Sequence, residues 1–283
     1  MKLVEFCIQD IDAKVPKSSS GSRVTALLHE PSVEFGNGLE QTFPAVVVLP
    51  GGAYEYCSDR EAEPIAMKYF AAGYSTFILR YSVRPDLFPQ PLYEVFALLA
   101  HIRKNPALYY VAPAKIAVCG FSAGGHLAAA SGTMWKDPGI ARVLGDTPYD
   151  FRPDGMILCY AASCLNLEGL SLHLTSGANP GLLPPIDKKI DAQTSPAFFW
   201  STFEDTIVDV EDALTMGKCM KKAGVPFEMH IYPHGPHGLA LGDRYSCKKG
   251  KEHQIVPHIQ SWMPLSVQWL NMLFGYNQDV IKP

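Results

Sequence analysis

Several features that identify other classes of protein are missing from this sequence of 283 residues. It contains no apolar run of about 18 residues, the length that a membrane-spanning helix needs. Its basic cluster at 248–251 is short and its formal net charge is −4, which argues against a nucleic-acid partner. The first residues lack the apolar core and the small-residue cleavage site of a signal peptide. We therefore expect no membrane segment and no nucleic-acid-binding surface.

Cysteines at metal-ligand or redox spacing are missing as well. The seven cysteines are scattered, and no two of them have the Cys-x-x-Cys spacing that is typical of zinc and redox sites. Cys119 and Cys159 lie in apolar runs, where a thiol packs as a small hydrophobic side chain. We predict a cytoplasmic protein with reduced thiols and no bound metal.

The chain does contain an alternation of strand-like and helix-like segments. Its hydrophobic fraction of 47% and charged fraction of 18% are globular values. Two early strands, predicted to be antiparallel, precede apolar runs that alternate with segments of helical spacing. This alternation predicts right-handed crossovers and a mostly parallel sheet with helices on both faces. The predicted strands are 2–8, 22–29, 43–49, 74–81, 115–119, 155–160, 197–203 and 227–232, and the predicted helices are 59–72, 92–104, 210–223 and 255–274, with one more from about 125.

The chain shows no internal repeat and no linker, so residues 1–283 are predicted to form a single α/β domain. One irregular stretch, 162–195, is rich in Gly, Pro and Asn and separates two predicted strands. Irregular stretches of this length in a compact domain are usually functional or mobile. We predict that 162–195 is a small cap-like insertion over the site described next. The oligomeric state is open between a monomer and a homodimer.

A Gly-Phe-Ser-Ala-Gly motif at 120–124 lies between a predicted strand and a predicted helix. In this setting the serine of G-x-S-x-G sits at the apex of a sharp turn with its hydroxyl exposed. The strained turn needs small neighbours, and Gly120, Ala123 and Gly124 are small. The alternative is an ordinary glycine-rich turn that contains a serine. The later part of the chain favours Ser122 as a nucleophile.

A serine hydroxyl attacks efficiently only with a base in reach and a carboxylate to orient that base. Reactive groups of an α/β sheet gather at the carboxyl ends of the strands. Glu204 and Asp205 follow the seventh predicted strand, and His234 and His237 follow the eighth. The order serine, acid, histidine suits this fold. We predict Asp205 as the acid and His237 as the base, with Glu204 and His234 as the competing assignments.

Acyl transfer also needs N–H donors for a developing oxyanion. The backbone N–H of Ala123, after the nucleophile, is predicted to supply one. The Gly-Gly-Ala turn at 51–53 follows an early strand and is predicted to supply others from Gly52 and Ala53. The alternative is an ordinary Gly-Gly turn, and its position upstream of the serine motif favours the oxyanion role.

Three side chains near these turns have weaker predictions. Tyr54 and Tyr56 are predicted to line the substrate pocket, although tyrosines beside a glycine turn are as often packing residues. Arg80 is predicted to have a structural role, paired with a carboxylate such as Glu61 or Glu63.

Four segments together resemble the α/β-hydrolase superfamily, and within it bacterial esterases of the acetyl-esterase and lipase group, often labelled acetylxylan-esterase-like. The resemblance implies an eight-stranded hydrolase sheet, a Ser-His-Asp triad and no cofactor. Many relatives carry His-Gly-Gly-Gly at the oxyanion turn, where this chain has Pro50 in place of the histidine and Ala53 in place of the third glycine. The segments that carry the resemblance are 50–54, 79–83, 120–128 and 234–238.

These residues predict a serine carboxylesterase that hydrolyses small-molecule esters of short acyl groups, acetyl above all, with acetylated sugars among the substrates. One alternative is an amidase or peptidase on the same triad, such as an arylformamidase. The other is a non-catalytic binding protein of the same fold, which is disfavoured because all three triad positions are filled. The polar composition of 162–195 favours short acyl groups, since a lipase lid would present a broad apolar face.

Overall fold

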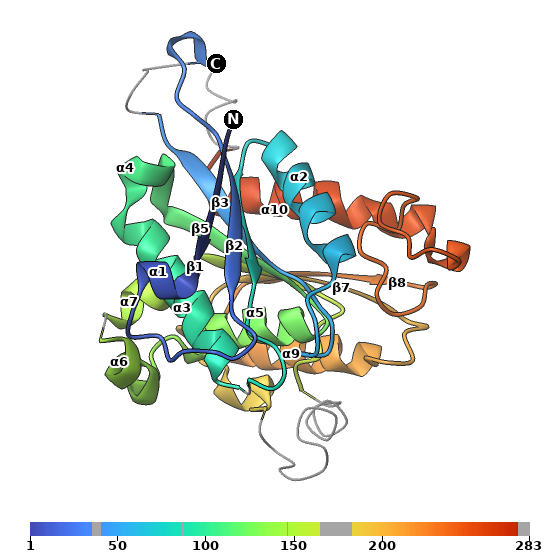
Figure 1. Ribbon diagram of the computed structural model, residues 1–283. Helices are drawn as coiled ribbons and strands as arrows, with labels where there is room; N and C mark the ends of the chain where they lie inside the picture. The colour runs from blue at the N-terminus through green and yellow to red at the C-terminus, as the bar shows by residue number, and fades with distance from the viewer. Residues whose placement is uncertain (36–40, 87, 146, 165–182, 277–283) are drawn as a thin grey trace.

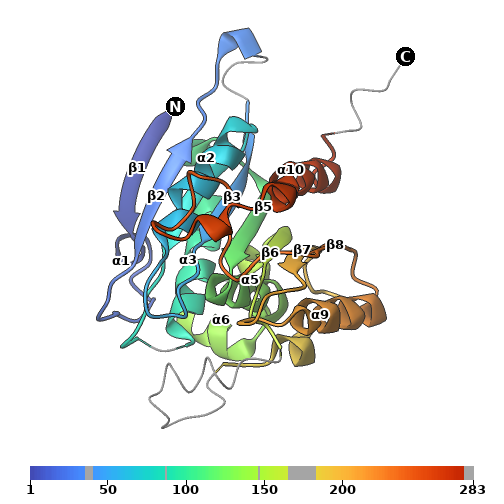
Figure 2. The same ribbon diagram turned by 90° about the vertical axis from the view of Figure 1, so that its right-hand side faces the viewer.

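A computed structural model describes residues 1–35, 41–86, 88–145, 147–164 and 183–276. Its centre is an eight-stranded sheet of order β1-β2-β4-β3-β5-β6-β7-β8. The first two strands are antiparallel to each other and β2 is antiparallel to β4, whereas all the other pairs are parallel. Figures 1 and 2 show β1 at one edge of this twisted sheet and β8 at the other. The predicted mostly parallel α/β sheet is confirmed.

Every predicted strand is present, with small shifts of its ends. Six of the seven residues of β3 are buried, because helices cover both faces of the sheet there. The strands are β1 (Lys2–Cys7), β2 (Arg23–Leu28), β3 (Phe43–Leu49), β4 (Ser75–Arg80), β5 (Val111–Phe121), β6 (Gly155–Cys159), β7 (Ala197–Thr202) and β8 (Phe227–Tyr232).

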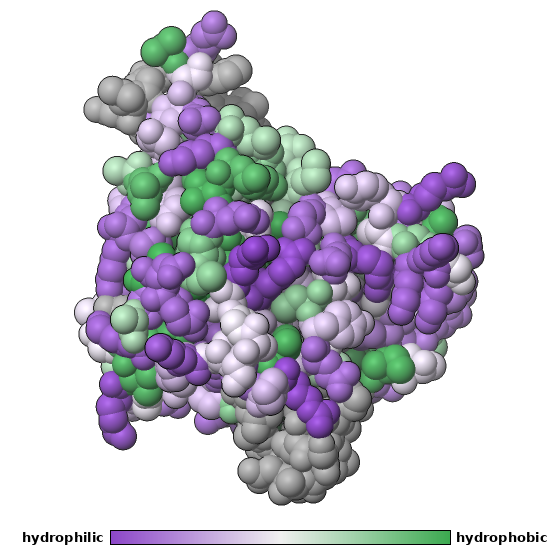
Figure 3. Space-filling view, viewed as in Figure 1, coloured by the Kyte–Doolittle hydropathy of each residue, from purple (hydrophilic) through white to green (hydrophobic). Residues whose placement is uncertain are grey.

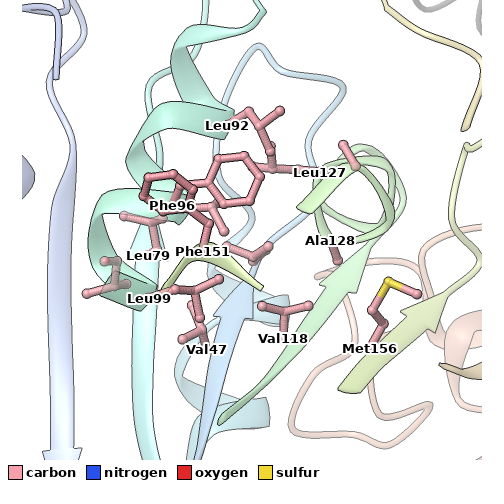
Figure 4. Close-up of a cluster of buried hydrophobic side chains, with 14 of the residues drawn as sticks. Val47, Leu79, Leu92, Phe96, Leu99, Val118, Leu127, Ala128, Phe151 and Met156 are labelled. Carbon is pink, nitrogen blue, oxygen red and sulfur yellow. The ribbon is translucent and has the colours of Figure 1, made fainter. Parts of the chain in front are cut away.

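The core has two layers, one on each face of the sheet. Alternate residues of β3 point to opposite layers: Val47 packs in one cluster, and Val46 and Val48 in the other. Figure 4 shows part of the first layer, where Leu92, Phe96 and their neighbours lie against the sheet. The first layer contains α3 (Gln90–Lys104), α5 (Ala123–Met134), α7 (Pro148–Phe151) and α9 (Val210–Ala223), and the second contains α2 (Glu63–Ala71) and α10 (Trp262–Leu273).

Two predicted helices begin later than expected, and proline explains both. The helix predicted to be capped by Asp59 begins at Glu63, and 59–61 form a short 3-10 turn, η3 (Asp59–Glu61). Pro64 fits the first turn of a helix but would clash inside one that began at 59. The C-terminal helix predicted from 255 begins at Trp262, which places Pro264 in its first turn for the same reason.

The remaining short elements connect the layers. Of the predicted insertion 162–195, residues 165–182 lie outside the described residues, so its cap-like arrangement stays a prediction. The connecting elements are α1 (Ile8–Ile11), η1 (Val33–Phe35), α4 (Pro106–Tyr109), α6 (Pro138–Leu144), η4 (Ile186–Lys189), η5 (Glu252–Gln254) and η6 (Pro257–Ser261).

The surface view in Figure 3 shows hydrophilic side chains over most of one face, with smaller apolar areas between them. In the part of the chain that the structure describes, no helix has both the length and the apolar character to span a membrane. The parallel strands from β4 to β8 end at the same edge of the sheet, and there the predicted site residues meet.

Candidate active site

The turn from β5 to α5 places Ser122 at its apex. Its φ of 52° and ψ of −116° lie outside the helical and extended regions, and a residue keeps such a conformation only when its surroundings impose it. The Ser122 N–H donates to the Cys159 carbonyl at 3.0 Å. A β-carbon on Gly120 would lie 2.1 Å from the Gly124 carbonyl oxygen, and one on Gly124 would lie 2.2 Å from that of Leu49. The close backbone contacts therefore require glycine at both motif positions.

Three predicted side chains meet beyond the ends of β5, β7 and β8. His237 Nε2 lies 2.9 Å from Ser122 Oγ, and His237 Nδ1 lies 2.7 Å from Asp205 Oδ2. An ionised carboxylate only accepts hydrogen bonds, so Nδ1 carries the proton and donates it to Asp205. The Nε2 lone pair is then directed at the Ser122 hydroxyl, which is the arrangement for proton abstraction. The side chains of His237 and Asp205 are only 17% and 1% exposed, so water competes little with this pair.

Asp205 is fixed by its own turn as well as by His237. Its second oxygen, Oδ1, accepts the N–H groups of Ile207 at 2.9 Å and Val208 at 3.0 Å. The two carboxylate oxygens therefore have separate partners, and the plane of the carboxylate cannot rotate without breaking a hydrogen bond.

The competing residues form a second pair on the outside of the same loops. Glu204 Oε1 lies 2.8 Å from His234 Nδ1, and Glu204 Oε2 accepts the N–H of Gly235 at 3.1 Å. These hydrogen bonds, that from His234 first, lower the pKa of Glu204. The side chains of His234 and Glu204 are 76% and 53% exposed. Their contacts favour the assignment of Asp205 and His237 over Glu204 and His234.

The turn after β3 directs two amides away from the protein's own acceptors. Gly52 has φ of 133° and Ala53 has φ of 54°. A β-carbon on Gly52 would lie 2.0 Å from the Tyr56 carbonyl oxygen, so only glycine fits there. The N–H of Gly51 already donates to Glu61 Oε2 at 2.8 Å. Within the described ranges, no backbone or side-chain acceptor bonds the N–H of Gly52 or Ala53, and both remain available to a ligand.

The third predicted donor belongs to Ala123, the first residue of α5. The first N–H groups of a helix have no partner within it, and the positive end of the helix dipole adds to their attraction for an anion. Ala123 therefore offers an N–H directly beside the Ser122 hydroxyl.

Two further contacts brace the turn at 50–53, where the predicted oxyanion donors lie. The hydroxyl of Tyr81 donates to the Pro50 carbonyl at 2.6 Å. The N–H of Ser58 donates to the carbonyl of Gly51 at 2.9 Å. Because both carbonyls are held, the turn is supported with proline, rather than histidine, at position 50.

Tyr54 lies in the core, whereas Tyr56 is 60% exposed. The Tyr54 hydroxyl lies 2.8 Å from His126 Nδ1, and His126 Nε2 lies 3.3 Å from the Pro184 carbonyl. Burial is the main cause that lowers the pKa of His126 to about 4, so its ring is neutral at pH 7. A neutral ring that donates to the carbonyl of Pro184 accepts from the Tyr54 hydroxyl. His126 therefore links the 51–54 turn, α5 and Pro184 within the 162–195 stretch. This position favours a supporting role for Tyr54, and the pocket-lining role of Tyr56 stays a prediction.

Acid is expected to destabilise the fold through His126. An imidazole in the unfolded chain titrates near pH ~6.5, whereas folding lowers the pKa of His126 to about 4. The unfolded chain therefore binds the proton more readily, and the stabilisation present above pH ~6.5 is lost as the pH falls toward 4. The loss is about 2–3 kcal/mol. We expect urea unfolding at pH 7 and pH 4.5 to show it, with a smaller pH effect in His126→Asn.

The comparison of the two proteins isolates His126, because the other histidines are present in both. His29 and His101, whose pKa values are also lowered by burial, contribute equally to wild type and variant. Equal loss of unfolding free energy in both proteins would contradict the assignment of the effect to His126.

The predicted pairing of Arg80 with a nearby carboxylate is confirmed for one of its two named candidates. Arg80 pairs with Glu63 and with Asp59, each at 2.9 Å, and not with Glu61. Glu61 is 3% exposed and faces inward, because η3 turns it toward Gly51. Its burial has no signal in the local sequence, where four of the five residues at 59–63 are charged.

Among the residues that the structure describes, no group of three or more His, Cys, Asp or Glu side chains is arranged to hold a metal ion.

The BD-FAE family matches residues 34–149 of this chain. Among solved structures, the alpha/beta hydrolase enzyme MGS-M1 from a Medee basin deep-sea metagenome library is 33% identical, with a TM-score of 0.76 over 96% of this chain and 98% of its own. The acetyl ester-xyloside bifunctional hydrolase from Caldicellulosiruptor lactoaceticus is 28% identical, with a TM-score of 0.77 over 95% of this chain and 96% of its own.

Two curated relatives are much longer than this chain. Endo-1,4-beta-xylanase B of Butyrivibrio fibrisolvens is 30% identical over 213 residues, which are 70% of this chain. Acetylxylan esterase of Xylanibacter ruminicola is 25% identical over 236 residues, which are 77% of this chain. The chain spans 33% of the length of the first protein and 45% of the second.

Proposed function

This chain belongs to the α/β-hydrolase superfamily, and we propose that it is a serine carboxylesterase. The observation that carries the proposal is the hydrogen-bond chain from Ser122 through His237 to Asp205, at 2.9 and 2.7 Å. The available amides beside Ser122 support it, because an esterase must stabilise an oxyanion at that place.

In this mechanism Ser122 Oγ attacks the ester carbonyl carbon while its proton passes to His237 Nε2. The N–H groups of Gly52, Ala53 and Ala123 hold the negatively charged oxygen of the tetrahedral intermediate. The C–O bond of the ester then breaks, and His237 gives its proton to the departing alkoxide. Water, deprotonated in turn by His237, attacks the acyl-enzyme carbonyl; the bond from the acyl carbon to Ser122 Oγ then breaks, and His237 returns the proton to Ser122 as the acid leaves. Asp205 keeps the proton of His237 on Nδ1 and stabilises the imidazolium in both steps.

We propose short acyl groups, acetyl above all, as the preferred substrates, and acetylated carbohydrates as their source. Two relatives support this choice: one is named an acetylxylan esterase and the other an acetyl ester-xyloside bifunctional hydrolase. The ring of Tyr56 is exposed and lies near Gly52, since a β-carbon there would be 3.2 Å from it, which supports a contact between this ring and a bound ester.

The acyl-chain profile tests the proposed function. Each CH₂ bound in an apolar pocket contributes about 0.8 kcal/mol, so an enzyme with a long apolar site gains with every added carbon. We expect kcat/KM on p-nitrophenyl esters of two to twelve carbons to be highest from acetate to butyrate, and acetylated xylo-oligosaccharides to be deacetylated. p-Nitroacetanilide serves as the matched amide control. A maximum at eight carbons or more would refute the short-acyl proposal, and faster cleavage of the anilide would favour an amidase.

A single domain over 1–283 and a cytoplasmic location are separate proposals, and the oligomeric state is open between a monomer and a homodimer. The single eight-stranded sheet supports the first, and the seven free cysteines favour a reducing compartment. Cell fractionation and light scattering measure the other two directly.

A further inference from the structure

Two adjacent residues have no role in the proposed mechanism but lie against the site. Together they contact the oxyanion turn at 51–53 and the side chains and backbone around His237. Arg60 and Glu61 lie in η3, between the oxyanion turn and α2. Glu61 is 3% exposed, and its two oxygens have different partners. Oε2 accepts the N–H of Gly51 at 2.8 Å, and Oε1 accepts the hydroxyl of Tyr160 at 2.6 Å.

Tyr160 connects Glu61 to the loop after β8 that contains His237, Gly238 and Ala240, here called the histidine loop. It follows β6 directly, and its hydroxyl also accepts the N–H of Ala240 at 3.0 Å. Because a hydroxyl has one proton, and that proton goes to Glu61, the oxygen is free to accept from Ala240. The Tyr160 ring packs edge-on against His237, with ring centres 5.0 Å apart. Glu61 therefore reaches the histidine loop through a single side chain.

Arg60 holds the same loop from its other side. Its Nη1 donates to the carbonyl of Gly238 at 3.0 Å and to that of Ser246 at 3.2 Å. Gly238 is the residue after His237, so this contact fixes the backbone beside the proposed base. Arg60 thus binds the histidine loop directly, whereas Glu61 binds the oxyanion turn directly and reaches the histidine loop through Tyr160.

We propose that Arg60 and Glu61 are positioning residues that set the distance between the oxyanion turn and His237. This inference rests on the proposed function and deepens it. Glu61 engages the N–H of Gly51, so the next two amides, those of Gly52 and Ala53, are the ones left for the oxyanion. A buried carboxylate is a costly way to gain stability, whereas its directional hydrogen bonds fix geometry. A displacement of 1 Å at such a site costs about 10²-fold in rate.

Glu61→Gln tests the proposal because it retains the shape of the side chain. An amide has one acceptor oxygen, so its NH₂ group must face either the N–H of Gly51 or the hydroxyl of Tyr160. Facing Gly51 puts donor against donor, and facing Tyr160 leaves that hydroxyl without an acceptor. We expect kcat for p-nitrophenyl acetate to fall about 10- to 100-fold, with KM within about threefold of wild type.

Phenylboronic acid supplies the readout that a purely structural role would not change. It adds to the proposed nucleophile as a tetrahedral anion, so its affinity depends on the oxyanion donors. We expect its Ki to rise by about the same factor as kcat falls. Glu63→Gln is the matched control, since Glu63 pairs with Arg80 at the surface and should leave kcat and Ki unchanged.

Tyr160→Phe keeps the ring against His237 and removes only the hydroxyl, so it tests the same contact if Glu61→Gln does not fold. We expect it to lower kcat about 3- to 30-fold, and the double variant to lose less than the product of the single losses. Folded variants with kcat and Ki within twofold of wild type would overturn the positioning role. A wild-type protein that hydrolyses none of the esters would instead overturn the proposed function.

Discussion

Ser122→Ala is expected to lower kcat for p-nitrophenyl acetate by at least about 10³-fold while the protein stays folded. The substitution removes only the hydroxyl group, and the oxygen of that group is the atom that His237 contacts at 2.9 Å. Without it no acyl-enzyme forms, and the remaining rate comes from binding and the oxyanion donors. Steady-state kinetics on the purified variant, with a Tm measured beside it, provide the test.

Alanine is a suitable replacement at this strained position. Ala53 and Ala240 already adopt positive φ in this protein, so the backbone of the turn can be kept. A fluorophosphonate probe, which reacts with activated serines, should label the wild type and leave Ser122→Ala unlabelled. Near-wild-type hydrolysis by a folded, unlabelled variant would mean that another residue is the nucleophile.

The strands and the serine turn could be predicted because local sequence determines them. β3, β6 and β7 are short, mostly apolar runs whose residues are nearly all buried, and a strand buried on both faces needs such a run. Local contacts require the glycines of the serine motif. A β-carbon on Gly120, for example, would lie 2.1 Å from the Gly124 carbonyl oxygen. Patterns of this kind are visible in a single sequence.

The contacts that support the site could not be predicted in the same way. Glu61 and Tyr160 are 99 positions apart, and their hydrogen bond depends on how the loops of η3 and β6 meet. On sequence alone Glu61 and Glu63 were equal candidates to pair with Arg80. The later start of α2 imposed by Pro64 turns Glu61 inward, and its neighbour Glu63 takes the place at Arg80.

In the sequence, Asp205 could be preferred over Glu204 only for its position and its shorter side chain. The structure adds a physical reason, because the turn after β7 buries one of these two neighbouring side chains and exposes the other. Asp205 points inward and is nearly fully buried, whereas Glu204 points outward to His234. This difference leads to the second large expected effect.

Asp205→Asn is expected to lower kcat by about 10³- to 10⁴-fold, and Glu204→Gln by less than about threefold. The reason lies in the two N–H groups of Ile207 and Val208, which both donate to Oδ1 of Asp205. An asparagine can accept these two N–H groups only with its single side-chain oxygen. That orientation directs its NH₂ group at Nδ1 of His237. Nδ1 must then accept, so the proton of the ring moves to Nε2 and the lone pair that takes the Ser122 proton is lost.

The paired variants test this tautomer argument, because both remove one carboxylate charge from neighbouring positions on the same loop. Asp205→Asn keeps the size of the side chain, so its KM should stay near wild type while kcat falls. The fluorophosphonate probe should label it slowly but completely, since Ser122 is still present. The opposite ranking, with Glu204→Gln the more damaging change, would move the acid to Glu204 and make His234 the base. Such a result would require both loops to rearrange, because His234 Nδ1 now lies 2.8 Å from Glu204 on the outer side of these loops.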